Sequence, residues 1–310
     1  LLSAALVAVA GCSDGTTEKS ESSGKPHIVA TTGMVADLVR QVAGEAVEVE
    51  QIMGAGVDPH LYKPTRDDVQ AILSADAVFY SGLMLEGKMG DTLVKVGRSR
   101  PVFAVTELID ESKLLEDEGS AGHPDPHVWM DVAAWSECVG AVATAMAEVL
   151  PAKAAEFEKS AERHREELLA LDAYAREAIA TVPEARRVLV TSHDAFNYFG
   201  RAYGIEVLGV QGISTESEAG LRRINELVAL LVERQVPAVF VESSVSPKNI
   251  QALVDGAAAN GHEVVIGGEL FSDAMGQAGT YEGTYLGMLD HNATTVARAL
   301  GGVVPPLGKN

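Results

Sequence analysis

Short apolar runs alternate with longer amphipathic segments along most of the chain. The short runs are rich in Val, Ile and Phe, whereas the longer segments carry apolar residues at helical spacing. This alternation predicts strands that are each followed by a helix, and hence a mostly parallel sheet with helices on its faces. In the first half the predicted strands are residues 27–32, 47–53, 77–80 and 101–105, and the predicted helices are residues 34–42 and 66–73.

The second half repeats this pattern. Its predicted strands are residues 187–191, 205–210, 238–242 and 263–267, and its predicted helices are residues 194–203, 216–234 and 247–258. We therefore expect an α/β fold of two lobes, each a mostly parallel four-stranded sheet flanked by helices. The expected boundaries are residues 27–132 for the N-terminal lobe and residues 185–310 for the C-terminal lobe.

The segment between the two halves, residues 133–184, is rich in Ala and Glu and favours helix. Pro151 is its internal break, because a proline inside a helix removes a backbone hydrogen bond. A helix over residues 152–181 would be about 45 Å long. We expect this long helix to join the lobes as a rigid spacer. His164 lies among charged residues there and is expected on the solvent-exposed face.

Composition and charge narrow the class of protein. The chain has 310 residues, of which 47% are hydrophobic and 22% charged, which is typical of a soluble protein with substantial cores. Its formal net charge of −20 argues against a nucleic-acid partner, because phosphate binding needs basic patches. Neither half contains a Gly-x-Gly-x-x-Gly sequence or a phosphate-binding loop.

The two cysteines have different surroundings. Cys12 follows an apolar run and small residues, which resembles the lipobox of a lipoprotein signal peptide, where the cysteine is lipidated. The basic segment that precedes such a run is missing, so residues 1–12 are expected to be a truncated signal peptide. Residues 13–26 are polar and are expected to be a flexible tether. Cys138 lies in an apolar helical pattern and is expected to be a buried free thiol.

The tripeptide Asp-Pro-His occurs twice, at residues 58–60 and 125–127. Proline fixes its own φ and favours an extended residue before it, so each copy presents a histidine from a stiffened loop. A neutral imidazole is the commonest metal ligand in proteins, and a nearby carboxylate can accept its second N–H. One copy alone would be ordinary turn chemistry, but two copies after predicted strands favour a metal site.

Polar residues that follow other predicted strands extend this site, because ligands of open parallel sheets bind beyond the carboxyl ends of the strands. His60 and His127 follow strands of the first half. His193 follows the first strand of the second half, and Asp273 follows the last. His193 could instead cap a helix, and Asp273 could be a turn residue. Together, three imidazoles and one carboxylate suit one borderline divalent transition-metal ion.

Further residues are candidates to assist these ligands. Asp125, Asp131 and Glu242 could each accept a hydrogen bond from a ligand imidazole. His123 precedes His127 by four residues in an acidic loop and could be an auxiliary group for metal capture.

Five motifs in this order are similar to those of a known family. They are residues 58–65, 125–131, 191–199, 240–244 and 270–274. From about residue 27 to about residue 299, the chain resembles the zinc and manganese solute-binding lipoproteins of bacterial ABC transporters (solute-binding protein family 9). The resemblance implies two α/β lobes joined by one long helix, with the metal held between them. Its ligand positions fall on His60, His127, His193 and Asp273.

The resemblance also implies a function and partners. The chain would be an extracytoplasmic component that captures Zn²⁺ or Mn²⁺ and delivers it to a membrane permease with its ATPase. A lipid on Cys12 would hold it at the cell membrane, and we expect a monomer. The family has His or Glu at the position of His193, and a third imidazole favours zinc. However, zinc-dedicated members often have a long His-rich loop, and here residues 111–123 are acidic with a single His. Both metals therefore stay open.

Two other functions stay open as well. A secreted zinc hydrolase would use the three histidines as ligands and Asp273 or Glu242 as the base, but it needs an open coordination position. No His-Glu-x-x-His pair supports it. No motif speaks for or against a metal-binding surface adhesin. Because protein groups would fill all four positions, we expect no catalytic residues, a small closure of the lobes, and an affinity that falls below about pH 6.

Overall fold

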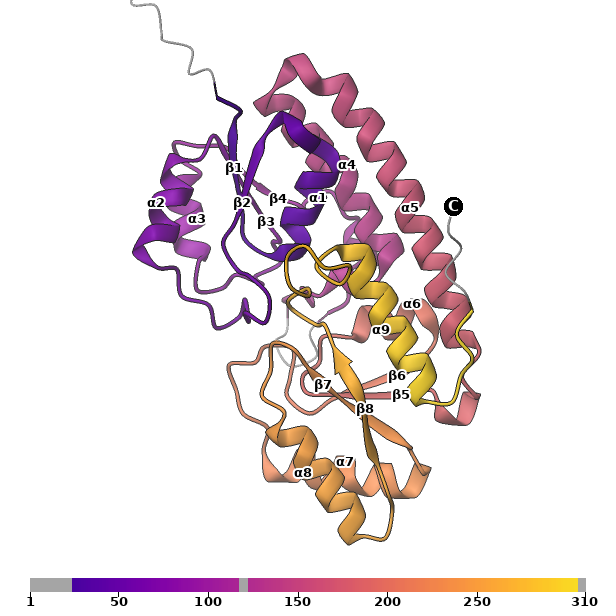
Figure 1. The fold of residues 1–310 in the computed structure, drawn as a ribbon. Coiled ribbons are helices and arrows are strands. Elements are labelled where there is room, and N and C mark those ends of the chain that lie inside the picture. The colour runs from indigo at the N-terminus through magenta and orange to yellow at the C-terminus, as the bar shows by residue number, and fades with distance from the viewer. Residues whose placement is uncertain (1–23, 117–121, 306–310) are drawn as a thin grey trace, which may run out of the picture.

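The computed structural model describes residues 24–116 and 122–305. Two α/β lobes lie on one side of a layer of long helices (Figure 1). The predicted signal peptide, Cys12 and most of the predicted tether lie outside the described residues. The α/β class expected from the alternating pattern is confirmed.

One parallel sheet forms the centre of the N-terminal lobe. Its strands run in the order β2-β1-β3-β4, and every pairing is parallel. Ile28 of β1 packs in the same cluster as α1, whereas the next residue, Val29, packs against α2 and α3 on the other face. Both faces of the central strands β1 and β3 are thus buried, which explains why these two strands are mostly apolar runs. The elements are β1 (His27–Ala30), α1 (Gly33–Ala43), β2 (Glu48–Gln51), α2 (Arg66–Ser74), β3 (Ala77–Tyr80), α3 (Gly90–Val96) and β4 (Val102–Ala104).

Helix α2 begins where the sequence places it. The Thr65 hydroxyl accepts from the backbone N of Asp68 at 3.2 Å, and the Asp68 carboxylate accepts from the backbone N of Thr65 at 2.7 Å. This reciprocal capping box satisfies two backbone donors that the helix itself cannot pair. Helix α3 was not predicted, because it is a single short helix bounded by Gly90 and Gly97, and glycine disfavours helix.

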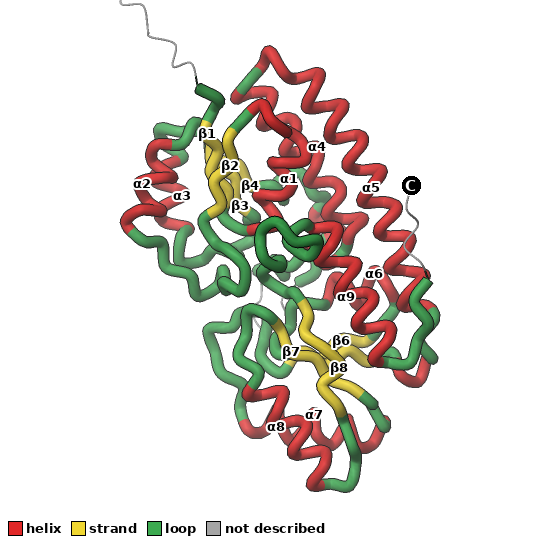
Figure 2. Tube along the Cα trace, in the orientation of Figure 1, coloured by secondary structure: helices red, strands yellow, loops and turns green. Residues whose placement is uncertain are grey.

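The C-terminal lobe differs from the expected four-stranded sheet. Its described strands form two parallel pairs, β5-β6 and β7-β8. Strands β5 and β7 lie against each other, but in the described part of the chain they share no ladder. Figure 2 shows the strands of the two lobes as separate groups, each next to helices. The elements are β5 (Val188–Thr191), α6 (Asn197–Tyr203), β6 (Glu206–Gly209), α7 (Leu221–Arg234), β7 (Ala238–Glu242), α8 (Lys248–Ala259) and β8 (Val265–Leu270).

One long helix, α5 (Ala154–Ala180), joins the lobes as expected, and α4 (Val132–Val149) and α9 (Tyr285–Ala299) pack against it. A short 3₁₀ turn that starts at Pro151 separates α4 from α5, as the proline predicts. Helix α5 has 27 residues, packs against α1 at one end and against α9 and α6 at the other, and spans about 40 Å. By length and composition α4 could cross a membrane, but half of it is buried, as in a core helix.

The helical layer contains Cys138, which was expected to be buried, and His164, which was expected to be exposed. Cys138 on α4 is a free and buried thiol, as predicted, and burial raises its pKa. His164 on α5 is fully buried, so its predicted exposure is wrong. Helices α1 and α4 pack over α5, and the charged residues near His164 in sequence are exposed, although one of them, Glu167, reaches Nδ1 of His164 at 3.1 Å.

Candidate metal centre

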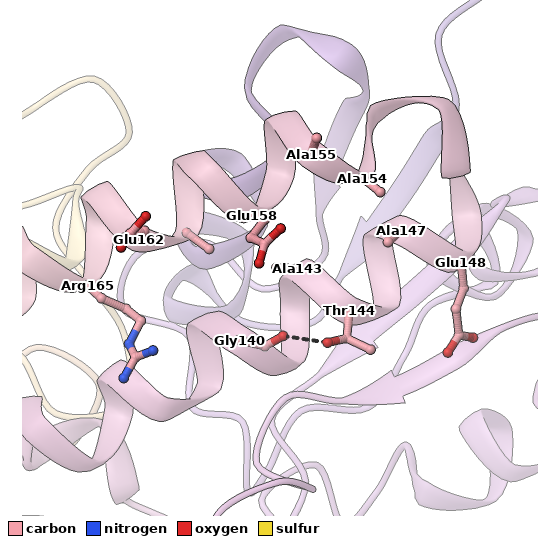
Figure 3. A pocket seen from close by; sticks show the side chains of 11 residues that line it. Gly140, Ala143, Thr144, Ala147, Glu148, Ala154, Ala155, Glu158, Glu162 and Arg165 are labelled. Carbon is pink, nitrogen blue, oxygen red and sulfur yellow. Dashed lines mark hydrogen bonds between the residues drawn. The ribbon is translucent and has the colours of Figure 1, made fainter.

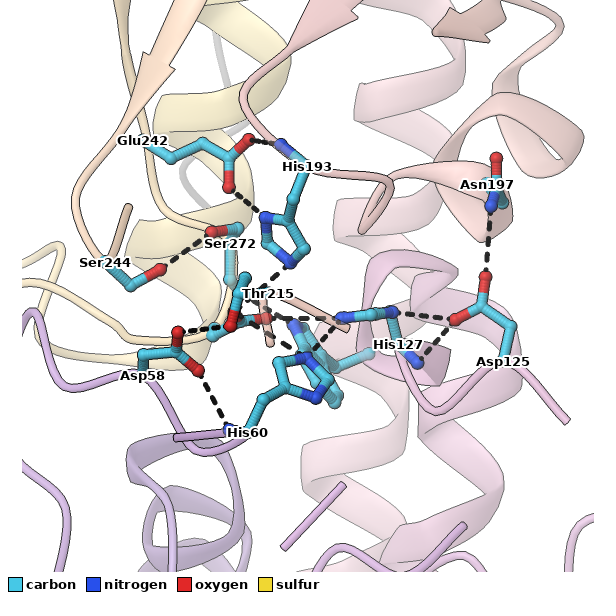
Figure 4. A network of polar contacts seen from close by, with 12 residues as sticks. Asp58, His60, Asp125, His127, His193, Asn197, Thr215, Glu242, Ser244 and Ser272 are labelled. Atoms are coloured by element: carbon cyan, nitrogen blue, oxygen red, sulfur yellow. Dashed lines mark hydrogen bonds and ion pairs between the residues drawn. The ribbon is translucent and has the colours of Figure 1, made fainter. Parts of the chain in front are cut away.

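Four side chains converge between the lobes, and one ligand atom from each lies within 4.8 Å of all the others. Two come from each lobe. His60 lies in the loop between β2 and α2, and His127 lies between β4 and α4. His193 follows β5, and Asp273 follows β8. All four lie beyond the carboxyl ends of strands, which is where open parallel sheets bind ligands. Figure 4 shows the three imidazoles pointing toward one another.

The distances between these atoms suit a single ion. His127 Nε2 lies 3.3 Å from His60 Nε2 and 3.3 Å from Asp273 Oδ1. His193 Nε2 lies 3.2 Å from Asp273 Oδ2, and His60 Nε2 lies 3.9 Å from the same oxygen. Bonds of 2.0–2.1 Å to a tetrahedral Zn²⁺ place neighbouring ligand atoms about 3.3 Å apart.

Burial leaves several of these atoms without hydrogen-bond partners. The exposed fraction is 0% for His127 and His193, 1% for Asp273 and 7% for His60. His193 Nε2 and both carboxylate oxygens of Asp273 are buried and form no hydrogen bond to the described residues. Native proteins pair nearly all buried polar atoms. A cation at the point where these atoms converge would satisfy them.

Two carboxylates orient two of the imidazoles. Asp125 Oδ1 accepts from the backbone N of His127 at 2.9 Å and from its Nδ1 at 2.7 Å. Glu242 accepts from the backbone N of His193 at 2.9 Å and from its Nδ1 at 2.5 Å. Holding the proton on Nδ1 leaves Nε2 free to bind a metal and makes the imidazole a stronger ligand.

Asp131 does not take the part that the sequence suggested. Its carboxylate caps α4 by accepting from the backbone N of Ala134 at 3.1 Å, and it pairs with Arg201 at 3.0 Å. It forms no hydrogen bond to an imidazole among the described residues. As the residue directly before a helix, an aspartate satisfies free backbone donors, and that use prevails here.

Asp58 was missed as a supporting residue. Its Oδ1 accepts from the backbone N of His60 at 2.8 Å, and its Oδ2 accepts from the hydroxyl of Thr215 at 2.5 Å. The repeated Asp-Pro-His could have indicated it, since Asp58 holds the same place in the first copy as Asp125 in the second. No local pattern marks Thr215, which lies 157 residues away in sequence.

The carboxylates also set the charges of the centre. Burial lowers the pKa of His127, but Asp125 and Asp273 outweigh it and raise that pKa to about 9. Burial likewise opposes charge on His193, yet Glu242 and Asp273 raise its pKa well above its usual value. Burial lowers the pKa of His60 to about 4, which Asp273 only partly offsets. His60 is therefore the neutral imidazole of the three at physiological pH.

A cavity of about 230 Å³ leads from the protein surface to His60. His123, Pro126 and Glu216 also line it, whereas His127, His193 and Asp273 do not. A larger cavity of about 940 Å³ lies between α4 and α5, where small side chains leave space (Figure 3). That cavity is lined by none of the four converging residues.

Comparison with known proteins extends these observations over nearly the whole chain. The family described as "zinc-uptake complex component A periplasmic" matches residues 28–299. The manganese-binding lipoprotein MntA of Bacillus subtilis (strain 168) is 48% identical over 296 residues, 96% of each chain. The zinc-binding protein TroA of Treponema pallidum (strain Nichols) is 49% identical over 284 residues, 92% of each chain. The solved structure of periplasmic TroA from Treponema pallidum matches with a TM-score of 0.87 at 50% identity, covering 89% of this chain and 99% of that one.

Proposed function

This chain belongs to the family of periplasmic zinc-uptake complex component A proteins, and from that premise we propose that it captures one Zn²⁺ or Mn²⁺ ion outside the cytoplasm and delivers it to the permease of an ABC transporter. The ion is held by His60, His127, His193 and Asp273. The observation that carries this proposal is the convergence of four metal-binding side chains, two from each lobe, on one buried point.

The ion is cargo for transport and takes no part in catalysis. Catalytic zinc sites keep one coordination position open for water or substrate. Here protein atoms supply four ligands at tetrahedral spacing, and three of the four residues are closed off from solvent. The hydrolase alternative therefore has less support, and the family assigns the chain to transport.

The site accepts both metals and holds Zn²⁺ more tightly. Relatives of nearly equal similarity are named for manganese and for zinc. Three imidazole nitrogens favour Zn²⁺, which stands above Mn²⁺ in the Irving–Williams order, whereas Mn²⁺ prefers more oxygen ligands. Availability of the two metals outside the cell then decides which ion is carried.

The protein acts as a membrane-anchored monomer. A lipid on Cys12 holds it at the outer side of the cell membrane, and residues 13–26 give it reach toward the permease. We infer a division into an N-terminal lobe in residues 27–132, a helical region in residues 133–184 and a C-terminal lobe in residues 185–310. The lipobox-like sequence before Cys12 and the lipoprotein names of its relatives support the anchor.

The test is competitive titration of metal-free protein with Zn²⁺ and Mn²⁺. One ion should bind per chain. His193→Ala should weaken binding of either ion at least about a hundredfold, more than loss of an orienting partner. The matched control is His27→Ala, which removes a partly exposed imidazole that pairs with Glu50. Absence of stoichiometric binding, or equal effects of the two variants, would overturn the proposal. Cleavage of esters or peptides by the metal-loaded protein would instead support the zinc hydrolase alternative.

A further inference from the structure

The two Asp-Pro-His copies support their histidines in different ways. Asp125 binds both the backbone N and the Nδ1 of His127, and Asn197 and Tyr198 in turn bind Asp125. Of the nitrogens of His60, Asp58 accepts only from the backbone N, and its other carboxylate oxygen accepts from the hydroxyl of Thr215. In the described part of the chain nothing hydrogen-bonds to Nδ1 of His60. His60 is therefore the least restrained of the three imidazoles.

His60 is also the residue that solvent reaches. It is the most exposed of the four and lines the 230 Å³ cavity, while the other three lie behind it. An ion that leaves the centre by this cavity has to pass His60. The freedom of His60 then limits how fast the ion leaves.

Thr215 belongs to the 211–218 loop of the C-terminal lobe, which follows β6. Ile213, Ser214 and Glu216 of this loop form one wall of the cavity. The loop reaches the N-terminal lobe through two polar contacts, Thr215 with Asp58 and Glu216 with Lys88. Figure 4 shows Thr215 facing the Asp58 carboxylate next to His60. The contact with Asp58 is partly buried, whereas the Lys88 pair is exposed.

We propose that Thr215 is a positioning residue for His60, and that its hydrogen bond to Asp58 across the lobes sets how long the ion stays bound. The hydroxyl holds the carboxylate, the carboxylate holds the backbone of His60, and the same loop walls the way out. A hydrogen bond to a charged group is among the stronger ones in proteins. This inference rests on the proposed function, because it concerns release of the ion from that centre.

The experiment measures release of Zn²⁺ from loaded protein to an excess of chromogenic chelator by stopped flow. Thr215→Val keeps the shape of the side chain and removes its donor. It should raise the dissociation rate constant about tenfold and change the association rate constant less than about threefold. Changes in affinity at one site usually arise from the dissociation rate constant. Thr215→Ser keeps the hydroxyl donor and loses the methyl group, and it should release Zn²⁺ at the wild-type rate. If Thr215 acted only through packing, Thr215→Ser would be the more affected variant.

Two further measurements separate the possible outcomes. If Thr215 acts through Asp58, then Thr215→Val should have no additional effect when combined with Asp58→Ala. Thr294→Val is the control, because it also removes a hydroxyl that is bonded to a distant side chain, Tyr174, but away from the centre. A wild-type release rate in Thr215→Val would overturn this inference while leaving the proposed function intact. Failure of the wild-type protein to bind Zn²⁺ would overturn the proposed function itself.

Discussion

The two lobes meet on two sides of the metal centre, and the sides are built differently. On the side of the helical layer the contact is apolar and buried: residues from strands of both lobes and from α1, α4, α5 and α9 form one hydrophobic cluster. Trp129 is fully buried there, donates to the carbonyl of Ser272 at 2.9 Å, and accepts from the hydroxyl of Tyr285 at 2.7 Å. On the cavity side the lobes meet through Thr215 with Asp58 and Lys88 with Glu216.

This difference indicates where the molecule can open. Separating the apolar side would expose large buried side chains to water, which costs far more than breaking two polar contacts that water can replace. We therefore expect small movements about the helical layer that widen the cavity side, in keeping with a rigid α5. Four measurements test this asymmetry, beginning with the largest expected effect.

The apolar side should contribute most of the free energy of unfolding that comes from contacts between the lobes. Trp129→Ala should lower the free energy of unfolding of metal-free protein by about 3–5 kcal/mol, because it leaves a large cavity and an unpaired carbonyl. Denaturant unfolding followed by circular dichroism measures this loss. The control on the cavity side is Met84→Ala, at a residue that is 69% exposed, which should change stability by less than about 0.5 kcal/mol. Comparable losses in the two variants would contradict the asymmetry.

Metal binding by the fully buried His127 and His193 should depend strongly on the carboxylates that hold their Nδ1 atoms, whereas His60 has no such partner among the described residues. Glu242→Gln places an amide where the carboxylate accepts from the backbone N and the Nδ1 of His193. The amide N–H₂ cannot accept, so Zn²⁺ affinity should fall about 10–100-fold. Competition titration measures this change. Ser244→Ala, at a neighbour whose hydroxyl bonds to Ser272, is the control and should bind like wild type.

The affinity should also depend on pH over a wide range. In metal-free protein His127 has its pKa raised to about 9, so it carries a proton at pH 7 that the metal must displace. The pKa of His193 is raised as well, so metal binding releases a proton from each of the two residues, and apparent affinity should rise by up to about a hundredfold per pH unit up to about pH 9 and fall as pH drops. Zn²⁺ titrations at pH 6, 7 and 8 measure the slope. A flat profile above pH 6, as the unperturbed histidine pKa implies, would show that His127 is neutral before binding.

The exposed contact on the cavity side should matter least. Glu216→Gln removes the charge that pairs with Lys88 at the rim of the cavity. Exposed ion pairs contribute little, so Zn²⁺ release should accelerate by less than about threefold. The same stopped-flow measurement at high salt should abolish even this difference, because salt screens exposed charges. If Glu216→Gln accelerated Zn²⁺ release more than Thr215→Val does, the Lys88–Glu216 pair would control release instead of the contact between Thr215 and Asp58.

Much of this protein follows from its sequence alone. Periodicity placed the strands of both halves within a few residues, Pro151 marked the break between α4 and α5, and the family was correctly identified from five motifs. The four converging residues were also predictable, because parallel strands end at one edge and polar residues that follow them share that edge. Each of these features depends on residues that are close in sequence or on a general property of sheets.

Tertiary packing decided the rest. The burial of His164 depends on which helices cover α5, and the pairing of Asp131 with Arg201 joins residues 70 positions apart. The described strands of the C-terminal lobe form two pairs in place of one sheet, and this depends on how β5 and β7 approach each other. The link from Thr215 to Asp58 joins residues 157 positions apart. Such contacts depend on how two separately built lobes meet, and no local pattern of apolar and polar residues records that geometry.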